Sequence, residues 1–244
     1  MNKILFGDCL EKMRAIPSGS IDMVILDPPY GTTPLYWDKC LDFTKLWVEL
    51  HRVCKDTSPI LVFGQEPFSS LVRCSNMKYY KYDWYWEKER LTNVFQVKRR
   101  PGKTIETISV FYKKQCTYNP QKTIHIGKPV SNKIGPDARW AVTMGGNNPN
   151  TVPLEYIDDG TRHPTQVLRI NRDNSRKALH PTQKPLELYE TFIKTYTDSN
   201  AMVLDPCVGS GTAGVACQNL NRDCILIEKD AEYYALIQKR LNSC

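Results

Sequence analysis

The stretch that decides the fold is Met202-Val203-Leu204-Asp205-Pro206-Cys207-Val208-Gly209-Ser210-Gly211-Thr212-Ala213-Gly214. Its first residues form a short apolar run typical of a strand, its glycines have the spacing G-x-G-x-x-G, and a helical pattern follows. Glycine lets the backbone approach a nucleotide closely, and Glu228, at the end of the next predicted strand, can accept hydrogen bonds from both ribose hydroxyls. We expect a nucleotide-binding turn here; the alternative is a helix-start turn that needs glycine only for packing.

The position of this turn in the chain indicates which nucleotide it binds. A dinucleotide-binding domain usually opens with such a turn and places the rest of its sheet after it, whereas only 30 residues follow Gly214. The other strands must therefore precede the turn, so the order of the sheet is permuted. Asp205 places a carboxylate beside the turn, where it would repel a pyrophosphate and attract an ammonium or sulfonium group. We therefore expect S-adenosylmethionine in preference to NAD.

Strand-like and helical patterns alternate through the rest of the chain, which predicts an α/β fold with a mainly parallel, twisted sheet. The predicted strands are Lys3–Phe6, Asp22–Leu26, Ile60–Phe63, Tyr82–Trp86, Ile108–Tyr112, Met202–Leu204 and Cys224–Ile227. The predicted helices are Phe43–Cys54, Pro67–Ser75, Leu186–Tyr196, Thr212–Leu220 and Ala231–Leu241. From about Gln115 to Ala178 turn-forming residues replace this periodicity, and the stretch is interpreted as an insertion with a function of its own.

A second signal, Asp27-Pro28-Pro29-Tyr30, directly follows the predicted strand Asp22–Leu26. Ligands of open α/β sheets bind at the carboxyl ends of strands, so this tetrapeptide and the glycine turn are expected to share one crevice. The prolines stiffen the loop and remove backbone donors, Asp27 offers a carboxylate acceptor, and Tyr30 offers an aromatic face. Together they predict a slot for a planar group that carries an amino group. A Pro-Pro turn with a capping aspartate is the alternative, and the neighbouring glycine turn argues against it.

Taken with further motifs, these residues resemble an amino-group DNA methyltransferase of the permuted, beta-type order. In that family the catalytic motif comes first, a target-recognition region follows, and the S-adenosylmethionine motif comes last. The resemblance covers nearly the whole chain. It is carried by Gly7-Asp8-Cys9-Leu10, Asp27–Tyr30, Trp37-Asp38, Phe63-Gly64-Gln65, Asn93, Ile108–Tyr112, Arg162-His163-Pro164-Thr165, His180-Pro181-Thr182-Gln183-Lys184-Pro185, Asp205–Thr212 and Ile227-Glu228.

The resemblance implies a Rossmann-like S-adenosylmethionine-dependent methyltransferase fold of circularly permuted order. Residues 1–114 would form the catalytic half of the methyltransferase domain, 115–178 the inserted target-recognition region, and 179–244 the cofactor-binding half. The catalytic residues that it implies are Asp27, Pro28, Pro29 and Tyr30. The cofactor-binding residues that it implies are Asp8, Cys9, Thr182, Lys184, Asp205, Cys207, Val208, Gly209, Ser210, Gly211, Thr212 and Glu228.

The resemblance also gives these cofactor-binding residues an order along the ligand. The implied contacts are Asp8 and the Cys9 backbone at the adenine, Glu228 at the ribose, Asp205 and Val208–Thr212 at the methionine part, and Thr182 and Lys184 closing over it, with Lys184 near the cofactor carboxylate. Cys207 stands where the family often carries phenylalanine.

The expected reaction is direct attack of an exocyclic nitrogen on the sulfonium methyl, because no cysteine has the setting that nucleophilic catalysis requires. Hydrogen bonds to Asp27 and the Pro28 carbonyl would favour a more pyramidal nitrogen, and stacking on Tyr30 would offset part of the cost of flipping the base out. In the family Asp-Pro-Pro-Tyr is commoner for adenine and Ser-Pro-Pro for cytosine, which favours adenine N6 in double-stranded DNA. An N4-cytosine methyltransferase and a catalytically inactive DNA-binding relative remain as alternatives. Methylation of protein glutamine or RNA is disfavoured, because such Asn-Pro-Pro-Tyr relatives usually place the glycine turn first.

The charge of the chain is unevenly distributed. The 244 residues include 33 Lys and Arg against 26 Asp and Glu, a net charge of +7, and the segment 81–184 holds 19 of these basic residues and only 9 acidic ones. This excess indicates a segment that binds a polyanion, with a merely solvated face as the alternative. We expect Lys98, Arg99, Arg100 and Arg162 to bind the phosphates of double-stranded DNA. A second copy of the chain and a cognate restriction nuclease are further candidate partners.

The cysteines and the hydropathy pattern bound the class of protein. The nine cysteines are scattered without a C-x-x-C pair, so we expect reduced thiols and no metal site. No apolar run approaches the roughly 18–20 residues of a membrane span, and the N-terminus lacks the apolar region of a signal peptide. The chain is interpreted as a soluble cytoplasmic protein, encoded by a bacterium or a phage, without a membrane partner.

Overall fold

The computed structural model describes residues 2–31, 41–124, 160–173 and 183–242. The chain folds into two compact units. The first consists of Met1–Asn119 and Thr165–Cys244, and the second of Pro120–Pro164. In the described part of the second unit, β6 (Thr123–Ile124) pairs antiparallel with β7 (Thr161–Arg162). The stretch 115–178, expected to be the target-recognition insertion, contains this second unit, and its role in recognition stays a prediction.

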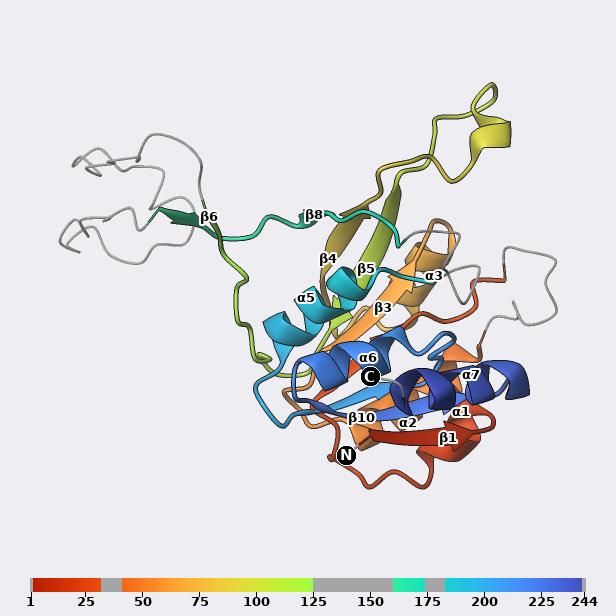
Figure 1. The fold of residues 1–244 in the computed structure, drawn as a ribbon, viewed down its shortest axis with the longest axis vertical. Helices are drawn as coiled ribbons and strands as arrows, with labels where there is room; N and C mark the ends of the chain where they lie inside the picture. Colours follow the sequence, from red (N-terminus) through yellow and green to blue (C-terminus); the bar gives the residue numbers. More distant parts are fainter. Residues whose placement is uncertain (1, 32–40, 125–159, 174–182, 243–244) are drawn as a thin grey trace. The chain divides into compact units, whose positions relative to one another are not determined.

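Among the described residues, an eight-stranded sheet forms the centre of the first unit, in the order β1-β10-β9-β2-β3-β5-β4-β8 (Figure 1). Its strands are β1 (Asn2–Phe6), β2 (Met23–Leu26), β3 (Ile60–Gly64), β4 (Tyr80–Glu87), β5 (Ile105–Phe111), β8 (Val167–Arg169), β9 (Met202–Asp205) and β10 (Asp223–Glu228). All neighbours pair in parallel except β5, which is antiparallel to both β3 and β4. The predicted α/β fold with a mainly parallel sheet is confirmed.

The permuted order is visible in the middle of this sheet. Strands β9 and β10, from the end of the chain, lie between β1 and β2, from its beginning (Figure 1). In the parallel pair of β2 and β9, Met23 is opposite Val203 and Val24 is opposite Leu204. Both strands therefore end at the same edge of the sheet, where the chain continues into Asp27 and into the glycine turn.

Helices cover both faces of the sheet and account for the continuous apolar strands. The helices of the first unit are α1 (Cys9–Met13), α2 (Phe43–Val53), α3 (Phe68–Ser75), α5 (Leu186–Tyr196), α6 (Thr212–Asn219) and α7 (Ala231–Asn242). Met23 and Ile25 of β2 pack in one core with α5, α6 and α7, while Val24 and Leu26 pack in the other with α1, α2 and α3. Because successive side chains of a strand point to opposite faces, a strand between two helical layers has no polar face.

A hydrogen-bonded aromatic cluster joins β4 to α5 inside one of these cores. The buried Trp84 donates its indole N–H to the Tyr196 hydroxyl at 2.6 Å, and the hydroxyls of Tyr82 and Tyr196 are 2.9 Å apart. Tyr196 is only 1% exposed. Its hydroxyl is therefore the shared partner of two groups, one of which is a buried donor.

We expect Tyr196→Phe to lower the free energy of unfolding by about 1–3 kcal/mol, because the Trp84 indole N–H would then be buried without an acceptor. Urea denaturation measures this loss. Tyr82→Phe is the matched control, since it also removes one hydroxyl but leaves the bond between Trp84 and Tyr196 intact. Equal losses in the two variants would contradict the central role of the Tyr196 hydroxyl.

Candidate active site

A cavity of about 730 Å³ lies at the carboxyl edge of the sheet. One part of its wall comes from residues at or just beyond the ends of four parallel strands. They are Gly7, Asp8 and Cys9 after β1, Asp27–Tyr30 after β2, Pro206, Cys207, Gly209 and Ser210 after β9, and Glu228, Lys229 and Asp230 at the end of β10. The two motifs that the sequence placed in one crevice thus line one cavity.

Asp27 is held by two side chains at the floor of this cavity. The Tyr30 hydroxyl donates to Asp27 Oδ1 at 2.8 Å, and Lys184 Nζ donates to Asp27 Oδ2 at 2.6 Å. The Tyr30 ring packs against Phe68 of α3 with the ring centroids 4.8 Å apart. Both carboxylate oxygens and the aromatic face therefore have defined positions. Contact between Lys184 and Asp27 was not expected from the sequence, which placed Lys184 near the cofactor carboxylate.

The ion pair of Lys184 and Asp27 continues into a buried chain of alternating charge. Lys184 Nζ lies 3.5 Å from Glu106 Oε2, and Glu106 Oε1 accepts hydrogen bonds from Lys88 Nζ and, at 3.1 Å, from Gln65 Nε2. Lys88, Glu106 and Lys184 are each less than a tenth exposed. All four charged side chains border the cavity.

Burial and ion pairing shift the pKa values of these buried side chains in opposite directions. Burial disfavours the charged forms of Lys184 and Glu106, but their partners outweigh it. The carboxylates of Asp27 and Glu106 raise the pKa of Lys184, and the ammonium groups of Lys184 and Lys88 lower the pKa of Glu106. For Lys88 burial dominates and lowers the pKa. Pairing therefore favours the charged forms of Lys184 and Glu106 despite their burial.

The glycine turn closes the other side of the cavity. Gly209 and Gly211 have φ angles of 54° and 84°, which residues other than glycine rarely adopt. Gly209 donates its backbone N–H to Glu228 Oε2 at 2.9 Å, while Glu228 Oε1 accepts from the Asp230 N–H at 2.9 Å. The carboxylate of Glu228 therefore ties the turn after β9 to the end of β10. Burial raises the pKa of Glu228, and these hydrogen bonds oppose the shift.

Asp205 is a buried carboxylate with unused bonding capacity. Its Oδ1 accepts the Cys207 N–H at 3.0 Å, but Oδ2 is buried and has no hydrogen-bond partner among the residues that the structure describes. Burial raises the pKa of Asp205 well above its usual range, and the charges of Asp27 and Glu228 add to that rise. A cationic ligand group next to Oδ2 would relieve both the missing bond and the repulsion.

The predicted adenine end of the site contains Asp8 and two cysteines. Asp8 caps α1, because its Oδ1 accepts the backbone N–H groups of Leu10 and Glu11 at 2.9 and 3.3 Å. The thiols of Cys9 and Cys207 share a hydrogen bond, which lowers the pKa of Cys9 and raises that of Cys207. Cys9 and Cys207 therefore bring the turns after β1 and β9 into contact.

The cavity collects most of the predicted site residues. Asp8, Cys9, Asp27, Pro28, Pro29, Tyr30, Arg100, Lys184, Cys207, Gly209, Ser210, Thr212 and Glu228 line it. Asp205, Val208 and Gly211 lie within or beside the turn without lining the cavity, Lys98 and Arg99 lie further along the β4–β5 hairpin, and Arg162 belongs to the second unit. Thr182 lies outside the described residues.

Sequence reasoning did not assign roles to several residues that the structure brings to the site. They are Gln65, Lys88, Lys103, Glu106, Arg172 and Tyr189. The position of Gln65 just beyond β3 was an available signal, because it is equivalent to that of Asp27 beyond β2. Glu106 lies just before the predicted strand Ile108–Tyr112 and inside the observed β5, where no periodicity marks a functional side chain.

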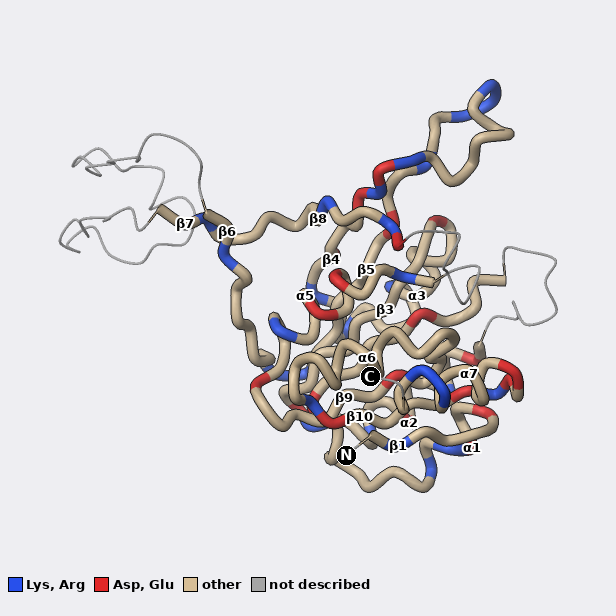
Figure 2. Tube along the Cα trace, viewed as in Figure 1, with Lys and Arg blue, Asp and Glu red and all other residues tan. Residues whose placement is uncertain are grey.

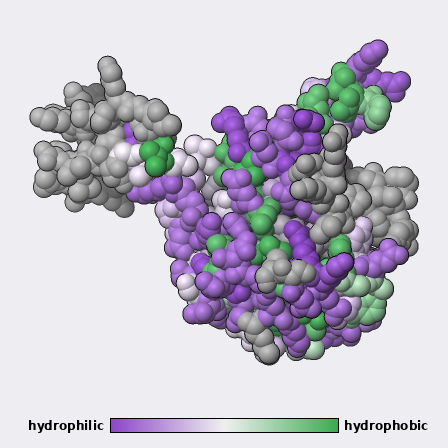
Figure 3. All heavy atoms as spheres, in the orientation of Figure 1, coloured by the Kyte–Doolittle hydropathy of each residue, from purple (hydrophilic) through white to green (hydrophobic). Residues whose placement is uncertain are grey.

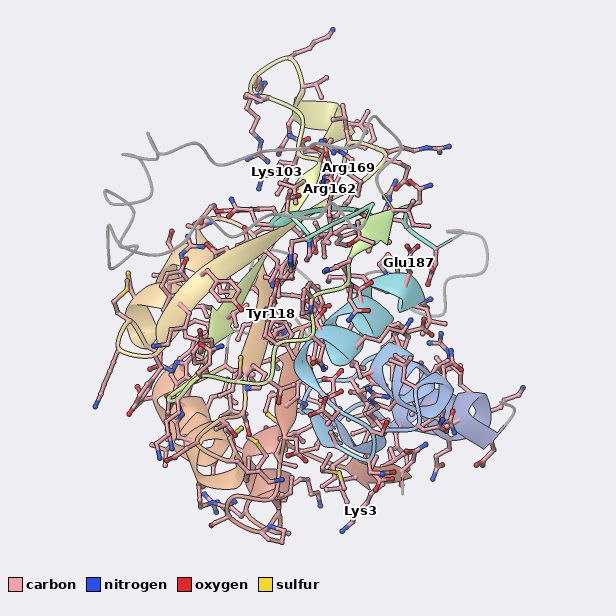
Figure 4. All side chains as sticks on the ribbon, turned by 90° about the vertical axis from the view of Figure 1, so that its left-hand side faces the viewer. Lys3, Lys103, Tyr118, Arg162, Arg169 and Glu187 are labelled. Carbon is pink, nitrogen blue, oxygen red and sulfur yellow. The ribbon has the colours of Figure 1, made fainter. Side chains whose placement is uncertain are left out.

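The β4–β5 hairpin carries positive charge away from the sheet. We call its connecting residues, 88–104, the arm; they project beyond the strands and carry a concentration of basic residues at their far end (Figure 2). Lys98, Arg99 and Arg100 are exposed. Lys103 of the arm and Arg169 of β8 lie at the same end of the unit, opposite to Lys3 of β1 (Figure 4).

In ranges 2–31, 41–124, 160–173 and 183–242, no group of three or more His, Cys, Asp or Glu side chains is arranged to hold a metal ion. Within the same ranges, every helix is too short or too polar to cross a membrane.

Comparison with known proteins gives matches over nearly the whole chain. A family model described as DNA methylase matches residues 21–239. The Type II methyltransferase M2.LlaDCHI of Lactococcus lactis subsp. cremoris is 48% identical over 269 residues, covering 98% of this chain and 88% of that protein. The DNA adenine methyltransferase YhdJ of Escherichia coli (strain K12) is 27% identical over 253 residues, covering 98% and 82%.

A solved structure matches the fold over its full length. The crystal structure of the M1.HpyAVI-SAM complex has a TM-score of 0.64 and 25% sequence identity, and the match covers 99% of this chain and 100% of that one. The similarity in fold therefore extends over nearly the whole of both chains.

We expect Asp205→Asn to stabilise the protein in the absence of ligand. Because the pKa of Asp205 is raised in the folded state, the wild type loses stability as the pH rises above the ordinary aspartate value of about 4. Asparagine keeps an oxygen for the Cys207 N–H and carries no charge, so its advantage should grow from acidic to neutral pH. Thermal melts across this pH range measure it, at roughly 2–4 °C for each kcal/mol.

Asp22→Asn is a useful control for this effect. Asp22 is a partly exposed carboxylate that pairs with Lys55 and accepts the Met202 N–H, so its removal should destabilise the protein at neutral pH. A melting temperature of Asp205→Asn at or below that of the wild type at neutral pH would contradict the uncompensated charge of Asp205.

Proposed function

Since the chain belongs to the DNA methylase family of N6/N4 amino-group methyltransferases, we propose that it methylates the exocyclic N6 of adenine at specific sites in double-stranded DNA, after flipping the base out. The observation that supports this most directly is the convergence of Asp27 and the glycine turn on one cavity. A methyl acceptor held by the first and a methyl donor held by the second would meet there.

The enzyme uses S-adenosylmethionine, and the residues of the cavity, together with the buried Asp205 at the start of the glycine turn, fit that cofactor. The sulfonium and ammonium groups of S-adenosylmethionine are cationic, and Asp205 Oδ2 is a buried acceptor that lacks a partner among the described residues. Gly209 leaves the turn without a side chain at the cavity wall. When bound, S-adenosylmethionine supplies a methyl group activated for transfer by the positive sulfur.

The proposed cofactor contacts keep the order expected from the sequence. Asp8 and the Cys9 backbone bind the adenine, Glu228 binds the ribose hydroxyls, and Asp205 with the turn binds the methionine part. The proposed role of Glu228 at the ribose is supported by its free lone pairs, because each carboxylate oxygen accepts one backbone N–H and can accept another hydrogen bond. The second predicted role of Lys184, at the cofactor carboxylate, competes with its ion pair to Asp27.

Asp27 and the Pro28 carbonyl are proposed to hold the target amine. The aromatic amine is a poor nucleophile because its lone pair is delocalised, and acceptors for its two hydrogens localise that pair on nitrogen. Once methylated, the nitrogen would have to lose one proton, and the Asp27 carboxylate that holds the amine would accept it. Tyr30 offers its ring to the flipped base, and its packing on Phe68 holds that ring in place.

Adenine is preferred to cytosine on two grounds. The catalytic loop reads Asp-Pro-Pro-Tyr, and the similar protein YhdJ is named a DNA adenine methyltransferase. N4-methylation of cytosine uses the same geometry of donors and acceptors and is the second candidate.

One experiment separates these candidates. The protein is incubated with S-adenosylmethionine and DNA from a methylation-deficient strain, the nucleosides are resolved by chromatography, and the modified positions are mapped by sequencing. N6-methyladenine at one short sequence supports the proposal. N4-methylcytosine establishes the second candidate, and unmodified DNA points to an inactive DNA-binding protein.

We expect Asp27→Ala to abolish methyl transfer while S-adenosylmethionine and DNA binding stay within about tenfold, or roughly 1.4 kcal/mol, of the wild type. Asp27 is proposed to orient the amine and not to bind either ligand strongly. Single-turnover kinetics and calorimetry measure the two effects. Tyr30→Phe, which keeps the ring and removes only the hydroxyl that donates to Asp27, should retain much of the activity. Wild-type turnover in Asp27→Ala would exclude the proposed role.

The basic arm and the inserted stretch are proposed to divide DNA binding between them. Lys98, Arg99, Arg100 and Arg162 contact phosphates, which gives affinity, while residues 115–178 read the sequence, which gives specificity. The exposure of Lys98, Arg99 and Arg100 on the projecting arm supports the first part. The separate compact unit Pro120–Pro164 supports the second.

We expect the triple variant Lys98→Ala, Arg99→Ala and Arg100→Ala to bind all duplexes more weakly and to flatten the dependence of log K on log salt by about two to three units of slope. A salt titration with the mapped site and a scrambled duplex measures both. The matched control removes three exposed lysines elsewhere, Lys45, Lys78 and Lys81. If both triple variants keep the slope of the wild type, the arm does not contact phosphates.

A further inference from the structure

The arm carries exposed apolar side chains that neither cofactor binding nor phosphate binding explains. Val94, Phe95 and Val97 are 59%, 103% and 46% exposed. Figure 3 shows an apolar surface on the projecting arm, flanked by hydrophilic residues. A phenyl ring in full contact with water on a projecting segment is unfavourable for the free protein, which indicates a partner that covers it.

The arm holds this ring on a braced turn. Asn93 bridges the two sides of the arm, since its Nδ2 donates to the Pro101 carbonyl at 3.0 Å and its Oδ1 accepts the Lys103 N–H at 2.6 Å. The Thr92 N–H donates to the Lys103 carbonyl at 2.9 Å, and the residues Val94–Gln96 form a short 3₁₀ helix, η1, stabilised by a bond from Gln96 N to Asn93 O. Phe95 therefore stands on a defined turn between two cross-linked segments.

Phe95 also belongs to the rim of the catalytic cavity. Phe95, Gln96 and Arg100 line the same cavity as Asp27 and Tyr30. A base that enters this cavity from a duplex would therefore leave its helix next to Phe95. The neighbouring positive charges of Lys98, Arg99 and Arg100 select a polyanion as the partner over an apolar protein surface.

We propose that Phe95 is a wedge that enters the DNA duplex at the target base pair and occupies the space left by the flipped base. This inference rests on the proposed function. Flipping leaves the opposite base unpaired and its neighbours without a stacking partner, and an inserted apolar side chain restores part of that stacking. The basic residues of the arm anchor the backbone on either side, so that the ring is directed between the bases.

The test uses a short duplex that carries the mapped methylation site in three forms: fully paired, with an abasic site opposite the target base, and with 2-aminopurine in place of the target adenine. On the paired duplex Phe95→Ala should lower the single-turnover rate by about tenfold. On the abasic duplex, where no pair must be opened, it should lie within about twofold of the wild type. The fluorescence rise of 2-aminopurine on binding should be reduced to a similar extent as the rate.

Two further variants control for shape and for the arm itself. Phe95→Leu keeps an apolar wedge and should retain most of the activity on the paired duplex. Val97→Ala removes another exposed apolar side chain of the arm that does not line the cavity, and should behave as the wild type.

Each other outcome overturns the wedge. A paired-duplex rate of Phe95→Ala equal to the wild type shows that the ring takes no part in flipping. Equal losses on the paired and abasic duplexes show a general contact with DNA. A change of sedimentation coefficient between Phe95→Ala and the wild type, without DNA, shows that the ring covers a second copy of the chain. If the wild type itself leaves the mapped site unmodified, the proposed function fails and not the wedge alone.

Discussion

The ion pair between Lys184 and Asp27 joins the N-terminal part of the first unit to its C-terminal part at the wall of the cavity. The two residues are 157 positions apart in sequence, and Lys184 is only 6% exposed. A buried charge costs several kcal/mol unless it is paired, so Lys184 requires Asp27 and Glu106, and Glu106 in turn requires Lys88. The position of the Asp27 carboxylate therefore depends on Glu106 of β5, on Lys184 before α5 and on Lys88 at the start of the arm.

This constraint acts on a sheet that already brings the motifs to one edge. Strands β2 and β9 are adjacent and parallel, so the loop after β2 and the turn after β9 must meet wherever both strands end. Burial is the main cause of the raised pKa of Asp205, and adjacency places the charge of Asp27 close enough to add to that rise. Lys184 pairs with the Asp27 carboxylate, while Asp205 Oδ2 has no partner among the described residues and, in the proposed function, would be left for the cofactor.

The sequence predicted the structure where the local environment of a residue restricts its type. Continuous apolar runs predicted β2, β3 and β9, and the glycine spacing predicted the turn at Gly209, because burial on both faces and positive φ angles restrict residue type directly. It was insufficient where the environment comes from distant partners. Nothing local distinguishes Glu106 from any other strand residue, and its function follows only from meeting Lys88 and Lys184. Short elements such as α1 and β8 were not predicted, because a segment of three to five residues is too short to show a helical or strand periodicity.

Asp205 and Phe95 break the ordinary rules of burial in opposite directions, and both do so at this site. Asp205 is a charge inside the protein whose Oδ2 lacks a hydrogen-bond partner in the described part of the chain, and Phe95 is an aromatic ring wholly outside the core. Each is unfavourable in the free protein and would become favourable if a ligand supplied the missing environment, a cation for the first and stacked bases for the second. In the proposed function, binding would recover the free energy given up in the unbound state, and these two departures would be the places where cofactor and DNA complete the structure.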